Sequence, residues 1–284
     1  MVERLIDKSI FYLNGDFITK DEALVNILDL GIVRGYGIFE FLITYQRKPF
    51  RLNDHIKRLI RSAGIIGLSL PWNEKQLSKL VNLPLDKNPK GEKSIRIIVT
   101  GGESENLITP SSNPTLAIIV LPYKRYPLEY YEKGGKIITY KFNRESPEAK
   151  TLNYIFEVRA SMEAKKLGAT EALYSYENSL YECVSSNFFS VKDGAIITTG
   201  ENILNGITRK VVLELIKDKY RIKFRPLRIS ELDSINEAFL TSSNREVMPI
   251  TMIDKIVIGN GIPGPITKNI MTAFTNYTKQ YSVR

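Results

Sequence analysis

The sequence predicts an α+β protein with two domains. The chain has 284 residues, which is more than one hydrophobic core usually organises. Short β-rich runs and amphipathic helical segments are interspersed in both halves, without the regular βαβ alternation of a doubly wound sheet. Residues 122–128 hold two prolines among polar and aromatic residues, which is typical of an interdomain linker. We therefore expect an N-terminal domain at 1–121 and a C-terminal domain at 129–284.

In the first half, turn signals and apolar spacing define the expected elements. Asn14-Gly15 lies between two short apolar runs and predicts a β-hairpin. Asn53 is the expected N-cap of a helix, because apolar residues follow it at helical spacing. Strands are expected at 37–45, 94–100 and 115–121.

In the second half, glycines mark the ends of the expected elements. Gly168 is expected to end a helix in the left-handed conformation. Asp193-Gly194 is expected to connect two strands as a hairpin. Strands are expected at 136–140, 172–176, 187–191, 195–198 and 238–241, and helices at 154–167, 208–219 and 267–281.

The composition limits the chemistry that the side chains can supply. There is one cysteine, Cys183, and one histidine, His55. Neither a disulfide within the chain nor a Cys/His zinc site can form from these two residues. Catalysis must therefore use lysine, tyrosine, arginine, glutamate or a cofactor.

The net charge of +9 has two interpretations. Scattered, solvated lysines explain it without a charged ligand. A basic, non-catalytic nucleic-acid-binding protein is the alternative from another class. We favour the first and expect no nucleic-acid partner, because no stripe of interleaved aromatic and basic residues stands out. No segment has the length of a membrane span or a signal-peptide core, so we expect no membrane partner and a cytoplasmic protein.

Two residues have the character of a cofactor site. Lys150 precedes a predicted helix, and a lysine in a semi-buried site can lose its proton and react with a carbonyl group. Glu182 lies among apolar, strand-like residues, where a carboxylate needs a cationic partner such as a protonated cofactor ring. Taken alone, a solvated lysine and a surface salt bridge remain the alternatives.

Three further positions suit a phosphate group. Residues 205–209 (Asn-Gly-Ile-Thr-Arg) open a predicted helix, whose N-terminal amides and dipole attract anions. Ser242-Ser243 follows a buried strand, and Arg58 on the helix after Asn53 can form a bidentate contact. A simple turn, a polar loop and a surface arginine are the respective alternatives.

The order and spacing of these residues resemble the class IV aminotransferases, which are fold type IV enzymes dependent on pyridoxal 5′-phosphate (PLP). Members include D-amino acid aminotransferases, branched-chain aminotransferases and aminodeoxychorismate lyases. The matching stretches, which cover nearly the full chain, are residues 29–40, 55–59, 150–154 (Lys-Thr-Leu-Asn-Tyr), 182–189, 205–209 and 241–250.

The resemblance implies the fold, the cofactor and the roles of the matching residues. It implies a small N-terminal α+β domain, a larger C-terminal domain with a barrel-like sheet, a homodimer and bound PLP. Lys150 resembles the catalytic lysine that binds the cofactor covalently, and Glu182 resembles the carboxylate that faces the pyridine nitrogen. The other implied cofactor contacts are Arg58, Ile207, Thr208, Ser242 and Ser243 at the phosphate, Tyr154 at the phenolic oxygen and Leu204 against the ring.

The match departs from the familiar pattern around the substrate. Phe39 and Gly101 stand where familiar D-amino acid aminotransferases have the tyrosine and the arginine that hold the α-carboxylate. Cys183 stands where aminotransferases commonly have glycine and where lyases can have cysteine.

Two other arginines are candidates for the substrate carboxylate. Arg34 lies in a loop that is expected to reach the active site of the partner subunit. Arg96 interrupts an apolar strand, which is costly unless it meets an anion, and an Arg96 on a solvated strand face is the alternative. We expect Arg34, Arg96, Phe39 and Asn244 to contact the substrate.

These observations together predict a PLP-dependent transaminase. It would move the amino group of a small amino acid to a 2-oxo acid such as 2-oxoglutarate or pyruvate. The two arginines slightly favour D-amino acids as donors. A branched-chain L-amino acid aminotransferase and a 4-amino-4-deoxychorismate lyase are the alternatives on the same scaffold.

Overall fold

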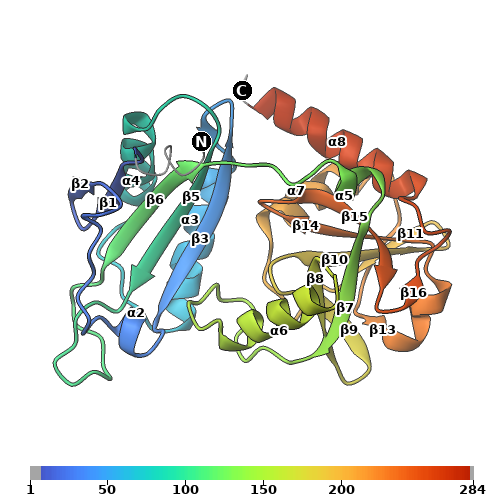
Figure 1. Cartoon of the computed structure of the whole chain (residues 1–284), viewed down its shortest axis with the longest axis horizontal. Coiled ribbons are helices and arrows are strands. Elements are labelled where there is room, and N and C mark those ends of the chain that lie inside the picture. The colour runs from blue at the N-terminus through green and yellow to red at the C-terminus, as the bar shows by residue number, and fades with distance from the viewer. Residues whose placement is uncertain (1–7, 282–284) are drawn as a thin grey trace. The chain divides into compact units, whose positions relative to one another are not determined.

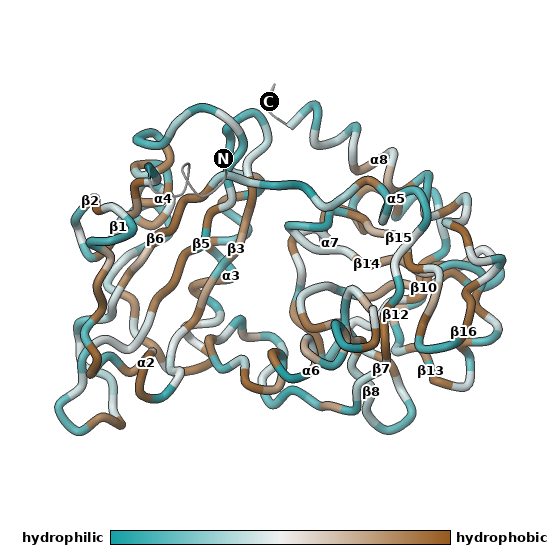
Figure 2. Tube along the Cα trace, viewed as in Figure 1, coloured by the Kyte–Doolittle hydropathy of each residue, from teal (hydrophilic) through white to brown (hydrophobic). Residues whose placement is uncertain are grey.

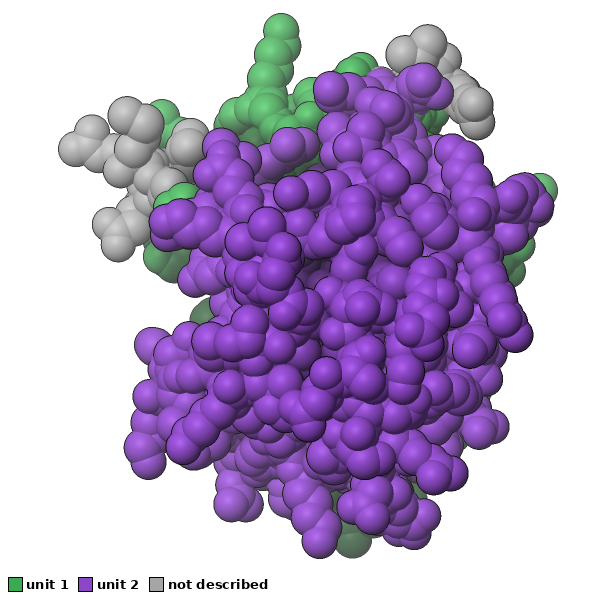
Figure 3. All heavy atoms as spheres, turned by 90° about the vertical axis from the view of Figure 1, so that its right-hand side faces the viewer, with its two compact units in different colours: residues 1–124, 149–153, 281–284 green, residues 125–148, 154–280 purple. Residues whose placement is uncertain are grey.

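The computed structural model describes residues 8–281 of the chain. These residues form two units, which Figure 3 shows in different colours. Unit 1 comprises residues 8–124, 149–153 and 281, and unit 2 comprises residues 125–148 and 154–280. The first change of unit falls at Lys124 and Arg125, within the stretch 122–128. The segment 149–153, which the expected division placed in the C-terminal domain, packs with unit 1 because it pairs with a strand of that unit.

Unit 1 is built on a six-stranded sheet with the order β2-β1-β6-β5-β3-β4 (Figure 1). Neighbouring strands in it are antiparallel. The predicted hairpin at Asn14-Gly15 is confirmed, and both residues have positive φ values, 51° and 118°, which suits a two-residue hairpin turn. The strands are β1 (Phe11–Leu13), β2 (Asp16–Ile18), β3 (Gly37–Tyr45), β4 (Lys48–Pro49), β5 (Lys93–Thr100) and β6 (Leu116–Pro122).

Helices α3 (Leu52–Ile65) and α4 (Glu74–Lys87) pack on this sheet and close the core of unit 1. The short helix α2 (Leu30–Val33) precedes β3. Figure 2 shows the hydrophobic runs of β5 and β6 that the helices help to bury. The core residues include Ile56 and Leu59 of α3, Leu77 and Val81 of α4, and Ile38, Leu42, Ile95, Ile97 and Val99 of the sheet.

One expectation for these helices was wrong, and one of the helices was not predicted. The helix expected after Asn53 is present, but it begins at Leu52, and its N-cap is Arg51 with a left-handed backbone (φ 52°). The N-cap prediction was therefore wrong, because the turn before the helix is set by backbone conformation and not by a capping side chain. Helix α4 was not predicted, although Asn73 and Gln76 form a reciprocal capping box at its start.

Unit 2 contains a ten-stranded sheet with the order β12-β11-β10-β14-β15-β7-β8-β9-β13, and β16 pairs with β15. Strand β7 is parallel to β8 and to β15. The hairpin predicted at Asp193-Gly194 is confirmed by its positive φ values of 51° and 71°. The strands are β7 (Gly135–Lys141), β8 (Glu171–Tyr176), β9 (Ser179–Cys183), β10 (Asn187–Lys192), β11 (Ala195–Thr198), β12 (Ile222–Phe224), β13 (Leu227–Arg228), β14 (Glu237–Ser242), β15 (Glu246–Ile253) and β16 (Ile256–Val257).

An additional pairing closes this sheet on itself. Asn187 of β10 pairs with Glu182 of β9, so β10, β14, β15, β7, β8 and β9 form a ring. Asn187 also pairs with Thr241 of β14. Because directly opposed residues of neighbouring strands share a face of the sheet, Glu182, Asn187 and Thr241 stand in one row. The expected α+β fold with a barrel-like sheet is confirmed.

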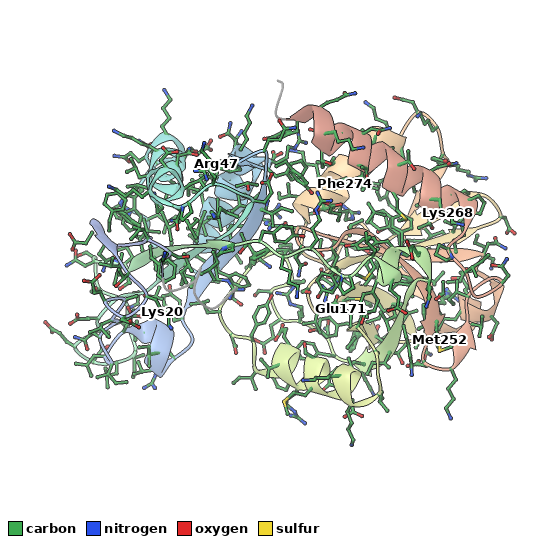
Figure 4. All side chains as sticks on the ribbon, turned by 45° about the horizontal axis from the view of Figure 1, so that its top comes forward. Lys20, Arg47, Glu171, Met252, Lys268 and Phe274 are labelled. Carbon is green, nitrogen blue, oxygen red and sulfur yellow. The ribbon has the colours of Figure 1, made fainter. Side chains whose placement is uncertain are left out.

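Helices surround the barrel-like sheet of unit 2 (Figure 1). Buried residues such as Ile270 and Phe274 fix the last helix against the unit, and Figure 4 labels Phe274. Among residues 8–281, no helix combines the length and the apolar character needed to cross a membrane. The helices are α5 (Glu129–Glu132), α6 (Ile155–Lys166), α7 (Ile207–Ile216), the 3₁₀ helix η1 (Ile229–Ser234) and α8 (Pro265–Tyr281).

Candidate active site

In unit 1, Arg58 is held by a buried carboxylate. Its Nε donates to Glu40 Oε1 and its Nη2 to Glu40 Oε2, both at 2.7 Å. The Nδ1 atom of His55 lies 2.7 Å from Glu40 Oε2. Arg58 is 8% exposed, and Glu40 and His55 are fully buried. The alternative of a surface arginine is therefore wrong, because Glu40 on β3 offers an ion pair inside the fold.

Charge and burial set the protonation of this cluster. Burial alone raises the pKa of Glu40, but the charge and hydrogen bonds of Arg58, with help from His55, outweigh it and lower this pKa to about 2. Burial lowers the pKa of His55 and outweighs the attraction of Glu40, so the imidazole is neutral near pH 7. Its Nε2 atom is buried and makes no hydrogen bond with the described residues. The arrangement fixes the guanidinium plane of Arg58, which suits it for recognising a planar or tetrahedral anion.

The segment with Lys150 runs beside β3 and is fixed through its backbone. Phe39 N donates to Lys150 O, and Leu152 N donates to Gly37 O, each at 2.9 Å. Lys150 N donates to Ser62 Oγ of α3 at 3.1 Å. The side chain of Lys150 is half-buried, with Nζ 4.3 Å from the centroid of the Phe39 ring. The structure thus anchors the lysine at its main chain and places its amine over an aromatic face.

The two candidate substrate arginines of unit 1 are exposed. Arg96 lies on β5 with its guanidinium 5.7 Å from the centroid of the Phe39 ring and 5.9 Å from that of Phe41. Its strand is apolar on the opposite face, so the expectation that Arg96 is buried, and for that reason needs an anion, was wrong. Arg34 is exposed after α2, and its Nη1 donates to Val33 O at 2.8 Å.

In unit 2, Glu182 is a buried carboxylate that accepts hydrogen bonds from several donors. Arg144 Nη1 donates to Oε1 at 2.9 Å, and Asn187 Nδ2 donates to Oε2 at 3.2 Å. Leu204 N lies 3.1 Å from both oxygens. The expected cationic partner of Glu182 therefore exists within the chain, and the alternative of a surface salt bridge is wrong because Glu182 is 4% exposed.

A second carboxylate shares the same arginine. Arg144 Nε lies 3.4 Å from Glu157 Oε1 on α6. The charge of the buried Arg209 also acts on Glu182. A protonated ring nitrogen beside Glu182 would meet a buried carboxylate, which favours the protonated form of the ring. Burial, reinforced by the two carboxylates, raises the pKa of Tyr154 to about 12 despite the opposing effect of Arg144. Tyr154 is therefore a neutral phenol that can donate a hydrogen bond.

The start of α7 has the features of an anion site. Gly206 is its N-cap and provides no side-chain hydrogen bond, so no capping side chain occupies the amides of Ile207 and Thr208. A Cβ atom on Gly206 would lie 2.0 Å from Asn187 Oδ1, which shows how closely Asn187 packs on this turn. Asn187 Nδ2 also donates to Leu204 O at 2.8 Å. The alternative of Thr208 as N-cap is wrong, because Thr208 lies inside the helix.

The end of β14 presents further hydroxyl groups. Thr241 Oγ1 is buried without a hydrogen-bond partner among the described residues, in the row that includes Asn187 and Glu182. Ser242 Oγ donates to Asn244 Oδ1 at 2.9 Å, and Ser243 is half-buried beside them. A phosphate, which accepts hydrogen bonds, fits these donors and the open start of α7.

Three residues of this cluster, Arg144, Glu157 and Asn187, were not predicted as site residues from the sequence. Glu157 carried a usable signal: it shares the buried face of α6 with Ala160 and Ala164, a position where a carboxylate needs a partner. Arg144 lies in a loop without periodicity and carried none. Cys183, by contrast, is a core residue of the barrel, and burial raises the pKa of its thiol well above the ordinary value.

Known proteins share this fold. The family described as amino-transferase class IV matches residues 37–253. A D-alanine aminotransferase of Staphylococcus aureus (strain N315) is 33% identical over 280 residues, which cover 96% of this chain and 99% of that protein. Two solved branched-chain amino acid aminotransferases, one from T.th. with pyridoxamine 5′-phosphate and one from Escherichia coli, are 27% and 26% identical. Their TM-scores are 0.88 and 0.89, with 95% of this chain and 94% of each solved chain covered.

The closed sheet, the buried carboxylate and the matched span define a class IV aminotransferase. The chain belongs to this family, as its resemblance implied. It is an aminotransferase with PLP as its cofactor and with amino acids and 2-oxo acids as substrates. This membership excludes the alternative of a non-catalytic nucleic-acid-binding protein.

Proposed function

We propose that Lys150 is the catalytic lysine that binds PLP covalently, and that Glu182 faces the pyridine nitrogen. The observation that carries this proposal is the environment of Glu182, which is a buried carboxylate held in place by several hydrogen-bond donors. An ionised Glu182 favours a protonated ring nitrogen. Bound PLP supplies an electron-withdrawing ring that weakens the bonds at the substrate α-carbon.

The other cofactor contacts of this proposal are the residues that the resemblance implies. Arg58, with its guanidinium fixed by Glu40, binds the phosphate. The amides of Ile207 and Thr208 and the hydroxyls of Ser242 and Ser243 bind it as well. In addition, Tyr154 donates to the phenolic oxygen of the cofactor, and Leu204 packs on its ring.

Lys150 also acts as the acid and base of the reaction. With PLP and substrate bound, the Nζ atom of Lys150 would accept the proton that leaves the substrate α-carbon and would return it in the course of the reaction. The backbone anchors of Lys150 hold the start of its side chain in place. The proximity of Nζ to the Phe39 ring provides an apolar surface on which the amine can rest.

For the substrate, we propose small amino acids, with D-amino acids slightly preferred as donors, and 2-oxoglutarate or pyruvate as acceptors. The similarity to D-alanine aminotransferases over nearly the full chain supports the preference. The similar structures of branched-chain enzymes support the L-amino acid alternative. Arg96, Arg34 of the partner subunit, Phe39 and Asn244 contact the substrate in this proposal.

Coupled assays of pyruvate, glutamate or 2-oxo acid formation test the substrate proposal. D-alanine, L-leucine and aminodeoxychorismate are offered in turn to the PLP-loaded protein. Turnover of D-alanine above that of L-leucine supports the proposal. Turnover of L-leucine alone identifies the branched-chain alternative, and pyruvate released from aminodeoxychorismate without an acceptor identifies the lyase.

We further propose that the chain is a homodimer. Exposed apolar side chains support this: Leu24, Ile27 and Ile32 are 79%, 70% and 51% exposed. On α6, Ile155, Val158 and Met162 recur on one side at helical spacing and are 67%, 53% and 67% exposed. A second copy of the chain would bury such surfaces. The cytoplasmic location stays a prediction.

A further inference from the structure

Arg144 contacts two buried carboxylates. One is Glu182, which is proposed to face the cofactor ring, and the other is Glu157. Arg144 Nη1 lies 2.9 Å from Glu182 Oε1, and Arg144 Nε lies 3.4 Å from Glu157 Oε1. The side chains are 13%, 5% and 6% exposed for Arg144, Glu182 and Glu157. Nη1 also contacts Pro147 O at 3.4 Å. The guanidinium of Arg144 is therefore a cation that contacts both carboxylates.

The arrangement has an electrostatic consequence. Burial lowers the pKa of Arg144, but the charge and hydrogen bond of Glu182, together with Tyr154 and Glu157, outweigh it and raise this pKa above its ordinary value. Arg144 is thus a permanent cation and a donor only. If it were removed, Glu157 and Glu182 would be like charges in a buried site. One of them would be driven to accept a proton or to move away.

We propose that Arg144 is a positioning residue of the cofactor site, which holds Glu182 ionised and oriented and keeps Glu157 from competing with it. This inference rests on the proposed role of Glu182. Arg144 itself need not touch the cofactor, since it acts through the carboxylate. Asn187 and the Leu204 amide are neutral donors to Glu182. The buried Arg209 also attracts this carboxylate, but Arg144 is the cation that contacts both carboxylates.

The test is a double-variant cycle on PLP affinity and on the visible spectrum of the bound cofactor. Arg144→Met removes the cation and keeps much of the side-chain volume, and it should weaken PLP binding about tenfold, as the loss of one charged hydrogen bond predicts. It should also shift the absorption of the bound cofactor. Glu157→Gln alone keeps the cation beside Glu182 and should therefore change both quantities less than Arg144→Met does.

The double variant distinguishes positioning from packing. If Arg144 acts by balancing charge, adding Glu157→Gln to Arg144→Met removes the like-charge pair and recovers at least part of the lost affinity. A double variant as weak as Arg144→Met would overturn the proposal, because glutamine has nearly the size of glutamate and would not restore packing that Arg144→Met had lost. Should Arg144→Met not fold, Arg144→Lys keeps the charge. Its affinity should then stay within about threefold of the parent, and a larger loss overturns the charge argument.

Glu182→Gln separates this inference from the proposed function. If Glu182 faces the ring nitrogen, Glu182→Gln shifts the spectrum of the bound cofactor whatever Arg144 does. If Glu182→Gln leaves the spectrum and the PLP dissociation constant unchanged, the role of Glu182 fails, and this inference fails with it. A shift with Glu182→Gln and none with the Arg144 variants overturns the inference alone.

Discussion

At the scale of single residues, the candidate site depends on charged groups that are paired and buried in the fold. Glu40 holds Arg58 through two hydrogen bonds, and Glu182 is held by Arg144 and Asn187. Breaking such a pair from one side leaves a charge buried without its partner, which costs more than the pair contributes. Substitution of one member therefore affects stability and cofactor binding together.

The first residue-scale prediction concerns acid stability. The pKa of Glu40 is about 2 in the folded protein, below the value of an unfolded glutamate. Its contribution to stability is therefore present above pH 4.5 and is lost as the pH falls from 4.5 towards 2, with a slope of up to about 1.4 kcal/mol per pH unit. Urea unfolding of Glu40→Gln across this range should lack that slope.

The exposed Glu74 provides the matched control for this experiment. Glu74→Gln should keep the pH dependence of the parent protein. An unchanged slope in Glu40→Gln would show that the Glu40–Arg58 pair does not set acid stability.

The second residue-scale prediction concerns Arg96. Because Arg96 is exposed and lies over two aromatic rings, its replacement should leave the fold intact. If it binds the substrate carboxylate, Arg96→Ala should raise the KM of the amino donor roughly tenfold to a hundredfold, the range for a charged hydrogen bond. The spectrum of the bound cofactor should not change. Steady-state kinetics with an unaltered KM would contradict the substrate role, and Arg34→Ala serves as the parallel variant.

At the scale of elements, local signals predicted most strands and helices. Both two-residue hairpins were predicted from Asn-Gly and Asp-Gly pairs, because these residues tolerate the positive φ values observed there. The strand at 195–198 was predicted with its observed bounds. Helix α4 was missed, although its apolar spacing and capping box were available, and it contains Pro84 in its last turn. Around Glu182 the residues were recognised as strand-like, but the bounds of β9 were not predicted, because the polar Glu182 interrupts the apolar pattern.

Contacts between distant segments could not be predicted from local sequence. Nothing near Arg144 predicted that it meets Glu182 and Glu157, since the three residues lie on a loop, a strand and a helix. The pairing of residues 149–153 with β3 also depends on the tertiary fold. Arg96 was placed in a buried strand because apolar neighbours suggested burial, but alternating side chains point to opposite faces.

The element-scale prediction concerns the turn before α7. A Cβ atom on Gly206 would meet Asn187 Oδ1 at 2.0 Å, so Gly206→Ala should displace Asn187 from Glu182 and Leu204. We expect a loss of about 1 to 3 kcal/mol in the free energy of unfolding and weaker PLP binding. In the control Gly64→Ala, the new Cβ meets nothing within 4 Å in helix α3. Gly64→Ala should therefore stabilise the protein by about 0.5 to 1 kcal/mol. A neutral Gly206→Ala would contradict the proposed role of this turn.

At the scale of the whole molecule, the proposed assembly depends on surfaces that a soluble monomer would rarely expose. Helix α6 inverts the usual pattern: its buried face carries Glu157 beside two alanines, and its exposed face carries Ile155, Val158 and Met162. The same helix therefore serves the charged cluster on one side and offers an apolar surface on the other. In the proposed homodimer, a second copy of the chain would cover this surface.

The corresponding prediction is a change of mass in solution. Met162→Asp should place a charge in the proposed interface and convert the dimer to a monomer, because burying an unpaired carboxylate costs several kcal/mol. Light scattering after size-exclusion chromatography measures the change. Ser161→Asp, at an exposed position of the same helix beside the apolar stripe, should leave the dimer intact. A parent protein with the mass of one chain would contradict the proposed homodimer.

Among these measurements, covalent trapping tests the central claim most directly. The protein is incubated with PLP, reduced with borohydride and digested, and the modified peptide is identified by mass spectrometry. We predict a phosphopyridoxyl group on Lys150, because an imine between this amine and the cofactor aldehyde is reduced to a stable bond. A label on another lysine, or no label after incubation, would contradict the assignment of Lys150 as the catalytic lysine.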